Sequence, residues 1–216
     1  MDSKIVTGGK MEKAVFLEIE NEELQFMGFI KANVSMNEET RKIANTILSK
    51  LYETWTGKYH KLSWIQYKTE FRYESLKDIQ PILNNAREEG ILDSEKIYMS
   101  LIAVCNFPKK RKLFWISTGN DMVYISKSGK ILNKLCHKMD KSTLKELNLI
   151  TMSRDFFFKT NGEVTGKHNH VFIVSYDAIE HFEKCIEDGV EVWQKRIESL
   201  SYNKAKPIII GEISSV

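Results

Sequence analysis

The chain has 216 residues, of which 42% are hydrophobic and 28% charged, so it is long enough to bury a core and too ordered in composition for a disordered or collagen-like class. Its 32 Lys and Arg residues against 29 Asp and Glu residues leave a net charge of +3, which excludes a polycation that coats nucleic acid along its whole length. No run approaches the roughly 18 apolar residues of a membrane span.

The N-terminal part predicts a β-hairpin followed by a helix. Residues 1–10 are treated as a flexible arm outside the fold. Two β-rich runs over 14–20 and 25–34 flank an acidic turn, which favours a hairpin. Ser35 and Glu38 have the spacing of a capping box, and apolar residues recur every fourth position over 37–55, which predicts a helix there.

Alternation then indicates a strand, and a second helix follows it. Over 64–73 apolar and polar residues alternate strictly, the pattern of a strand with one charged face. A helix is predicted over 78–89, with Pro81 tolerated near its first turn and Gly90 ending it.

The second half predicts mostly strands before a long final helix. Strand patterns form a β-meander, and Asn161-Gly162 is read as the turn before a strand over 170–175. A helix over 177–200 with an apolar stripe precedes a short last strand. The remaining expected elements are strands at 97–107, 113–117, 122–126, 152–159 and 208–210, and a short helix at 140–148.

Together these elements predict an α+β fold. We expect an antiparallel or mixed sheet with an N-terminal hairpin, a central β-meander and three main helices, the longest at the C-terminus. Residues 11–216 are expected to form one domain, with a possible subdivision near 91–95.

The charge is unevenly distributed. Residues 109–145 carry ten Lys or Arg against Asp121 and Asp140, a net charge of +8, so the rest of the chain carries −5. Part of that negative charge lies on the predicted C-terminal helix. The basic residues proposed to bind a ligand are Lys109, Lys110, Arg111, Lys112, Lys127, Lys130, Lys134 and Lys138.

Two interpretations of this basic segment stand side by side. Lysines at turns can reach phosphate oxygens and release counter-ions, and Phe114, Trp115 and Tyr124 can stack on bases if they are exposed. Alternatively the lysines keep a sheet soluble and protect its edges, while the three aromatic residues belong to the core. The second interpretation is favoured for the aromatic residues.

A histidine pair is the candidate for metal chemistry. His168 and His170 lie two residues apart at the start of a strand, which places both imidazoles on one face. With a carboxylate from Asp155 or Glu163 nearby, they can hold a divalent cation in a nuclease or related phosphodiester enzyme. Ordinary histidines near a turn are the alternative and the favoured interpretation.

Residues 96–186 resemble one known family. The meander, then Arg154-Asp155-Phe156-Phe157-Phe158, then the run His170 to Val174 and Phe182-Glu183 look like the core of KwaB, the soluble component of the Kiwa antiphage system. The resemblance implies DNA-linked phage defence together with a membrane partner. The matching positions are mostly apolar and would be packing residues.

The sequence therefore predicts a non-enzymatic protein that binds nucleic acid or an acidic protein through its basic segment, in phage defence or counter-defence. The alternatives are the metal-dependent phosphodiester enzyme and an inhibitor or immunity-type interaction protein. No cofactor and no membrane insertion are expected, and homo-oligomers are possible. The three cysteines, Cys105, Cys136 and Cys185, are odd in number and widely spaced, which indicates reduced thiols and a cytoplasmic location.

Overall fold

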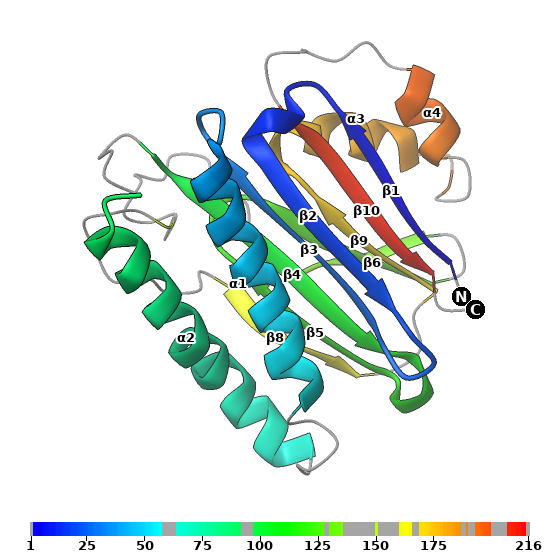
Figure 1. The fold of residues 1–216 in the computed structure, drawn as a ribbon. Helices are drawn as coiled ribbons and strands as arrows, with labels where there is room; N and C mark the ends of the chain where they lie inside the picture. Colours follow the sequence, from blue (N-terminus) through cyan, green and yellow to red (C-terminus); the bar gives the residue numbers. More distant parts are fainter. Residues whose placement is uncertain are drawn as a thin grey trace.

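The chain folds into two five-stranded antiparallel sheets that pack face to face, with helices on both outer faces (Figure 1). The structure is a computed structural model. It describes residues 2–57, 64–91, 97–127, 130–135, 150, 160–165, 169–186, 189, 193–199 and 207–214. The predicted α+β class is confirmed. Of the two arrangements left open, an antiparallel or a mixed sheet, the structure has two sheets in which every described strand pair is antiparallel.

The first sheet, called the helix-covered sheet, has the strand order β2-β3-β4-β5-β8. The predicted hairpin is present as β2 and β3, which pair antiparallel with Glu20 opposite Gln25. The strands are β2 (Ala14–Glu20), β3 (Gln25–Ala32), β4 (Met99–Phe107), β5 (Lys112–Ser117) and β8 (Thr160–Thr165).

The second sheet, called the terminal sheet, has the strand order β1-β10-β9-β6-β7 and joins the two ends of the chain. The strands are β1 (Asp2–Gly8), β6 (Met122–Lys127), β7 (Lys130–Lys134), β9 (His170–Val174) and β10 (Ile208–Ser214). Residues 2–8, set aside as an arm on sequence grounds, are paired along their whole length with β10.

The predicted meander is divided between the two sheets. Strands β4 and β5 belong to the helix-covered sheet, whereas β6 belongs to the terminal sheet. Residues 118–121 therefore carry the chain from one sheet to the other. The sequence predicted strands at these positions, but which sheet each strand joins depends on long-range pairing.

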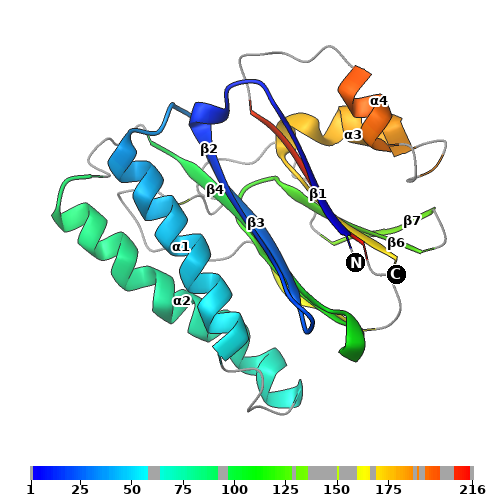
Figure 2. The same cartoon turned by 45° about the vertical axis from the view of Figure 1, so that its right-hand side comes forward.

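Two helices, α1 (Glu38–Gly57) and α2 (Trp64–Glu88), cover the outer face of the helix-covered sheet (Figures 1 and 2). The predicted α1 is confirmed within two residues at each end. Its N-cap differs from the expected Ser35 capping box: the side chain of Asn37 accepts a hydrogen bond from the backbone N–H of Thr40 at 2.8 Å.

The strand predicted over 64–73 is wrong, because these residues form the first part of α2. Phe71, Ser75, Ile79 and Leu83 are buried at four-residue spacing, and this helical stripe continues across the predicted boundary. Pro81 lies inside the helix, on its exposed side. The predicted end at Gly90 is confirmed, with a positive φ of 70° at that residue.

The prediction of a single long C-terminal helix over 177–200 is also wrong. A short 3₁₀ turn (Tyr176–Ala178) leads into α3 (Ile179–Ile186), and α4 (Trp193–Ser199) is separate. Gly189, with φ 122°, lies between them. Phe182, Trp193 and Ile197 are nevertheless buried, as their apolar stripe predicted.

Two smaller expectations concern residues 140–165. Asn161 and Gly162 lie within β8 and pair with β5 instead of forming a turn. The short helix at 140–148 and the strand at 152–159 fall outside the described residues.

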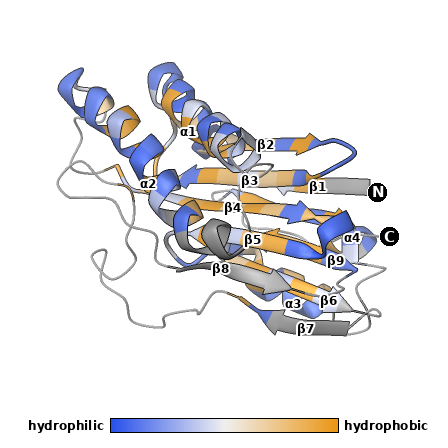
Figure 3. Cartoon of the chain, turned by 90° about the horizontal axis from the view of Figure 1, so that it is seen from below, coloured by the Kyte–Doolittle hydropathy of each residue, from blue (hydrophilic) through white to orange (hydrophobic). Residues whose placement is uncertain are grey.

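Two cores result from this layering. Alternate residues of β3 point to opposite sides: Phe26 and Ile30 pack with α1 and α2, while Met27 and Phe29 pack between the sheets. Hydrophobic residues accordingly line the central strands, and the outer turns of α1 and α2 are hydrophilic (Figure 3). The second core extends to α3 and α4, because the ring of Phe172 packs against those of Phe182 and Trp193.

Candidate functional site

A lysine points into the space between the sheets at one end of the sandwich. Met27, Phe29 and Lys31 alternate along β3, so Lys31 belongs to the same inward-facing row as two core residues. Its side chain is only 12% exposed. A cation at this position requires compensation from nearby anions, because burying an unpaired charge is very costly.

The terminal sheet supplies two aspartates. Asp121 ends the connection that crosses between the sheets and directly precedes β6, and Asp177 lies in the turn that follows β9. Strands β6 and β9 are antiparallel, with Met122 opposite Val174. Asp121, just before β6, and Asp177, just after β9, therefore lie at the same end of these two neighbouring strands.

The three charged groups form a bridge between the two sheets. The Lys31 ammonium lies 3.3 Å from Asp121 Oδ1 and 3.2 Å from Asp177 Oδ2. Asp121 Oδ1 also accepts a hydrogen bond from the backbone N–H of Tyr176 at 2.8 Å. Asp121 is 1% exposed and the Asp177 side chain 15%, so Asp177 is the carboxylate of this pair that solvent can reach.

The electrostatics of this cluster favour a charged lysine. Burial by itself lowers the pKa of Lys31, but the two carboxylates outweigh burial, so the pKa of Lys31 lies above its ordinary value of 10.5. Asp121 Oδ2 is buried and has no hydrogen-bond partner among the described residues. The ammonium group is therefore the main compensation for the Asp121 charge in this part of the chain.

The cluster was missed on sequence grounds, although one signal pointed to it. Inward-facing positions of a strand normally carry apolar residues, as Met27 and Phe29 do. A lysine at the next inward position breaks this rule and indicates a functional or paired charge. Asp121 was counted only as a minority charge in the basic segment, and Asp177 only as part of an acidic helix. Their approach depends on the crossing between the sheets, which no local pattern predicts.

The basic residues predicted to bind a ligand are only partly brought together. Lys109, Lys110 and Arg111 are exposed in the turn between β4 and β5, and Lys112 is half-buried at the start of β5. Because Asn106 pairs with Gln25 and Met99 with Ala32, this turn lies at the opposite end of the helix-covered sheet from Lys31.

Three of the remaining predicted lysines belong to the terminal sheet. Lys127 is the last residue of β6 and pairs with Lys130, the first residue of β7. Lys134 pairs with Glu183 Oε1 at 2.6 Å. Lys138 falls outside the described residues. The three aromatic residues considered as base-stacking groups, Phe114, Trp115 and Tyr124, are at most 9% exposed and belong to the cores, as the favoured interpretation held.

The histidine pair is described in part. His170 Nδ1 lies 2.6 Å from Glu212 Oε1, and Glu212 Oε2 accepts a hydrogen bond from Trp193 Nε1 at 2.7 Å. These contacts tie β9, β10 and α4 together, which is a structural role. His168 lies outside the described residues.

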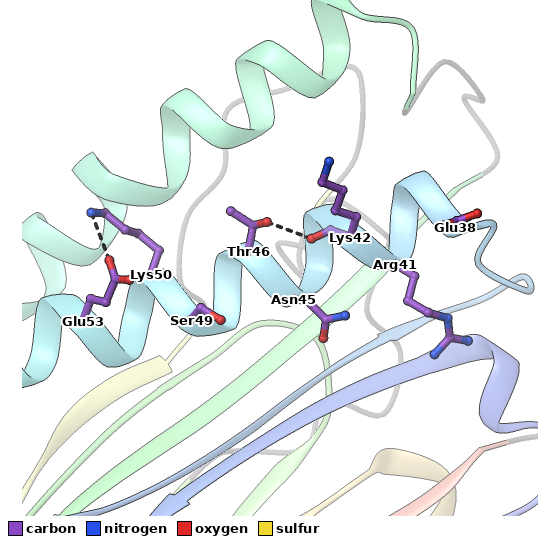
Figure 4. Close-up of a pocket in the computed structure, with 8 residues that line it drawn as sticks. All are labelled: Glu38, Arg41, Lys42, Asn45, Thr46, Ser49, Lys50 and Glu53. Carbon is purple, nitrogen blue, oxygen red and sulfur yellow. Dashed lines mark hydrogen bonds and ion pairs between the residues drawn. The ribbon is translucent and has the colours of Figure 1, made fainter.

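A surface pocket lies along the exposed side of α1, lined by residues of that helix alone (Figure 4). Lys50 pairs with Glu53 there at 3.5 Å, and Arg41 donates hydrogen bonds to the backbone oxygens of Ala14 and Glu12. These partners belong to the helix surface and its junction with β2. The pocket offers no buried polar group comparable to Lys31 or Asp121.

Two kinds of feature are absent from the described residues. No helix among them is both long and apolar enough to cross a membrane. Within the same part of the chain, no group of three or more His, Cys, Asp or Glu side chains is placed to hold a metal ion.

The chain is similar in structure to bacterial serine/threonine phosphatases. It matches the S. agalactiae serine/threonine phosphatase with a TM-score of 0.69 and 9% identity, covering 98% of each chain. It matches the serine/threonine phosphatase Stp1 from Staphylococcus aureus with a TM-score of 0.67 and 9% identity, over 99% of this chain and 94% of that one. RsbX, whose structure is a complex with magnesium, matches with a TM-score of 0.58 and 10% identity, over 97% of this chain and 92% of that one. No protein-family profile and no curated protein matches the sequence.

These similarities define the fold as one shared with serine/threonine phosphatases and correct two predictions. The resemblance of residues 96–186 to KwaB is wrong, because the neighbours share the phosphatase fold over essentially the whole chain. The prediction of a non-enzymatic protein that binds nucleic acid or an acidic protein in phage defence or counter-defence is wrong for the same reason. The assignment of the basic residues to ligand binding stays a prediction. The neighbours favour the enzyme alternative, which rested on His168 and His170; His170 instead pairs with Glu212.

Proposed function

We propose that this chain hydrolyses phosphate monoesters on serine or threonine side chains of proteins. The observation that carries the proposal is the fold, shared over 98% or more of this chain with serine/threonine phosphatases. Because the match extends over nearly the whole chain, the aligned region includes the segments that carry Lys31, Asp121 and Asp177.

Asp177 is the residue that we assign to the reaction. Hydrolysis of a phosphate monoester needs a water molecule whose proton is removed as it attacks phosphorus, and an ionised carboxylate can accept that proton. Of the two carboxylates that bind Lys31, Asp177 is the one with solvent access, at 15% against 1% for Asp121. Tyr176, which is 43% exposed, offers an aromatic surface beside it for a peptide substrate.

The test is release of inorganic phosphate from phosphoserine, phosphothreonine and phosphotyrosine peptides, each measured with Mg²⁺, with Mn²⁺ and with EDTA. We expect hydrolysis of the phosphoserine or phosphothreonine peptides, and a fall of about 100-fold in Asp177→Asn, the cost of losing a general base.

Glu180→Gln is the matched control for Asp177→Asn. Glu180 lies three residues further along the chain, with a side chain that is 79% exposed and pairs with Lys184 on the surface. This variant should keep the wild-type rate. A wild-type chain inactive on every peptide in all three conditions, or a rate equally reduced in both variants, would contradict the proposal.

The location and the partner follow from the same proposal. A cytoplasmic location is supported by Cys105 and Cys185, which are buried free thiols. The partner would be a phosphorylated, and therefore acidic, protein segment. The exposed cations Lys109, Lys110 and Arg111 can attract such a segment over a distance, an effect that high salt would screen.

A further inference from the structure

The Lys31 ammonium stands where a divalent cation would have to stand to use both aspartates. It contacts Asp121 Oδ1 and Asp177 Oδ2 at 3.3 and 3.2 Å. A magnesium ion needs carboxylate oxygens at about 2.0–2.1 Å and keeps several of its water molecules. A hydrated dication and an ammonium group cannot both occupy the space between these two oxygens.

The burial of Asp121 works in the same direction. Asp121 is 1% exposed, so a metal ion that reached it would lose most of its hydration shell, which magnesium gives up reluctantly. Its Oδ1 atom already accepts hydrogen bonds from Lys31 and from the backbone of Tyr176. Lys31 also reduces the charge of the aspartate pair from −2 to −1, which weakens the attraction for a second cation.

The residues present therefore do not fit the metal that the fold suggests through neighbours such as the magnesium complex of RsbX. Two carboxylates and an ammonium are not a ligand set for a dication, and the described part of the chain contains no cluster of three ligand side chains.

We propose that Lys31 is a built-in cation that closes the Asp121–Asp177 pair to Mg²⁺ and Mn²⁺. Removing the lysine side chain opens the pair, which then binds one divalent cation through its two carboxylates and water. This inference depends on the geometry around Lys31 and stands whether or not the chain hydrolyses phosphate esters.

Calorimetric titration with Mn²⁺ tests the proposal directly, using the full chain. The wild type should show no saturable site that Asp177→Asn removes. Lys31→Ala should gain a site that binds Mn²⁺ at least tenfold more tightly than the wild type does, and the double variant with Asp177→Asn should lose it. Lys50→Ala is the control, because Lys50 also pairs with a carboxylate, that of Glu53, but on an exposed helix surface.

Two results would overturn the proposal: wild-type binding of Mn²⁺ that Asp177→Asn abolishes, or a folded Lys31→Ala chain without the new site. If Lys31→Ala fails to fold, Lys31→Gln and the wild type decide the matter. In the wild type, the NMR signal of the Lys31 ammonium should survive addition of Mn²⁺, since no paramagnetic ion binds beside it. Its selective broadening would contradict the proposal.

These outcomes are separate from those of the hydrolysis assay. Hydrolysis that persists in EDTA agrees with both proposals. Hydrolysis that requires Mn²⁺, together with Mn²⁺ binding that needs Asp177, supports the proposed function and rejects the built-in cation. Absence of hydrolysis together with absence of binding rejects the function and leaves the built-in cation standing.

Discussion

Two opposing energies of comparable size act on Lys31: the cost of removing its charge from water and the attraction of the two carboxylates. Desolvation of a buried ammonium costs several kcal/mol, and the two carboxylates return that energy only while all three groups keep their geometry. The Asp121 carboxylate depends most on the Lys31 charge. It is 1% exposed, and its Oδ2 atom has no hydrogen-bond partner in the described part of the chain. Removing the lysine should therefore be more harmful than removing an ordinary surface cation.

We predict that Lys31→Met lowers the free energy of unfolding by about 3–5 kcal/mol at pH 7, the usual cost of leaving one charge of a buried pair uncompensated. Lys50→Met, which breaks an exposed pair with Glu53, should change it by less than about 0.5 kcal/mol. Urea denaturation of both variants measures the difference. Equal effects in the two variants would mean that Lys31 is not the compensating charge.

The same residue predicts a pH dependence. The pKa of Lys31 is raised in the folded state, so its stabilising contribution is complete below the ordinary value of 10.5 and is lost as the pH rises through the higher folded value. The gap in stability between the wild type and Lys31→Met should stay constant from pH 7 to about pH 10 and narrow at pH 11 and above. A gap that already closes between pH 7 and pH 9 would contradict this assignment.

At the scale of elements, local periodicity was a good guide where only one period fitted. Helix α1, the hairpin β2–β3 and the existence of strands β4 and β5 all follow from their residue patterns. It failed over 64–73, where alternation of apolar and polar residues fits a strand and the four-residue spacing of Phe71 and Ser75 fits a helix. Packing of α2 against α1 decides between the two, and that contact is not local.

The close approach of the two sheets depends on a glycine of β10. A Cβ atom on Gly211 would overlap Met27 Sδ and would lie 3.0 Å from Ile173 Cγ1. Met27 is 1% exposed, so it has little room to move away. The absence of a side chain at Gly211 is what allows β3 and β10 to pack at this distance.

We predict that Gly211→Ala lowers the free energy of unfolding by about 1–3 kcal/mol through overpacking. Gly57→Ala is the control, since no atom lies within 4 Å of its Cβ position at the end of α1. Gly57→Ala should leave stability unchanged or raise it slightly. In a Met27→Val background Gly211→Ala should cost clearly less, and a double-mutant cycle of thermal denaturation measures that coupling. Additive effects would show that Met27 is not the obstacle.

At the scale of the whole molecule, the sequence indicated the α+β class but not the sandwich. The pairing of β1 with β10, the crossing at residues 118–121 and the meeting of Lys31 with Asp121 and Asp177 all join segments far apart in the chain. Composition also directed attention to the basic segment, whose turn at 109–112 lies at the opposite end of the sheet from the charge cluster. Charge counted along a chain does not reveal which charges face inward.

We predict that removing residues 1–8 lowers the melting temperature by at least about 5 °C and promotes aggregation, because β10 becomes an exposed, isoleucine-rich edge strand. Point variants separate pairing from chain length. Val6 is buried and Thr7 exposed, so Val6→Ala should destabilise the fold and Thr7→Ala should not. Unchanged melting after the deletion would mean that the first residues behave as an arm.

The pairing of β1 with β10 also determines when the fold can be completed. Asp2–Gly8 is synthesised about 200 residues before Ile208–Ser214, so β1 has no partner in its sheet until β10 has also been made. The hairpin β2–β3, by contrast, has its partner within a few residues. Such non-local pairing makes folding slow. The helix-covered sheet can therefore begin to assemble before β10 has been synthesised, whereas the terminal sheet cannot be completed until then. The aspartate pair meets Lys31 only when the two sheets come together.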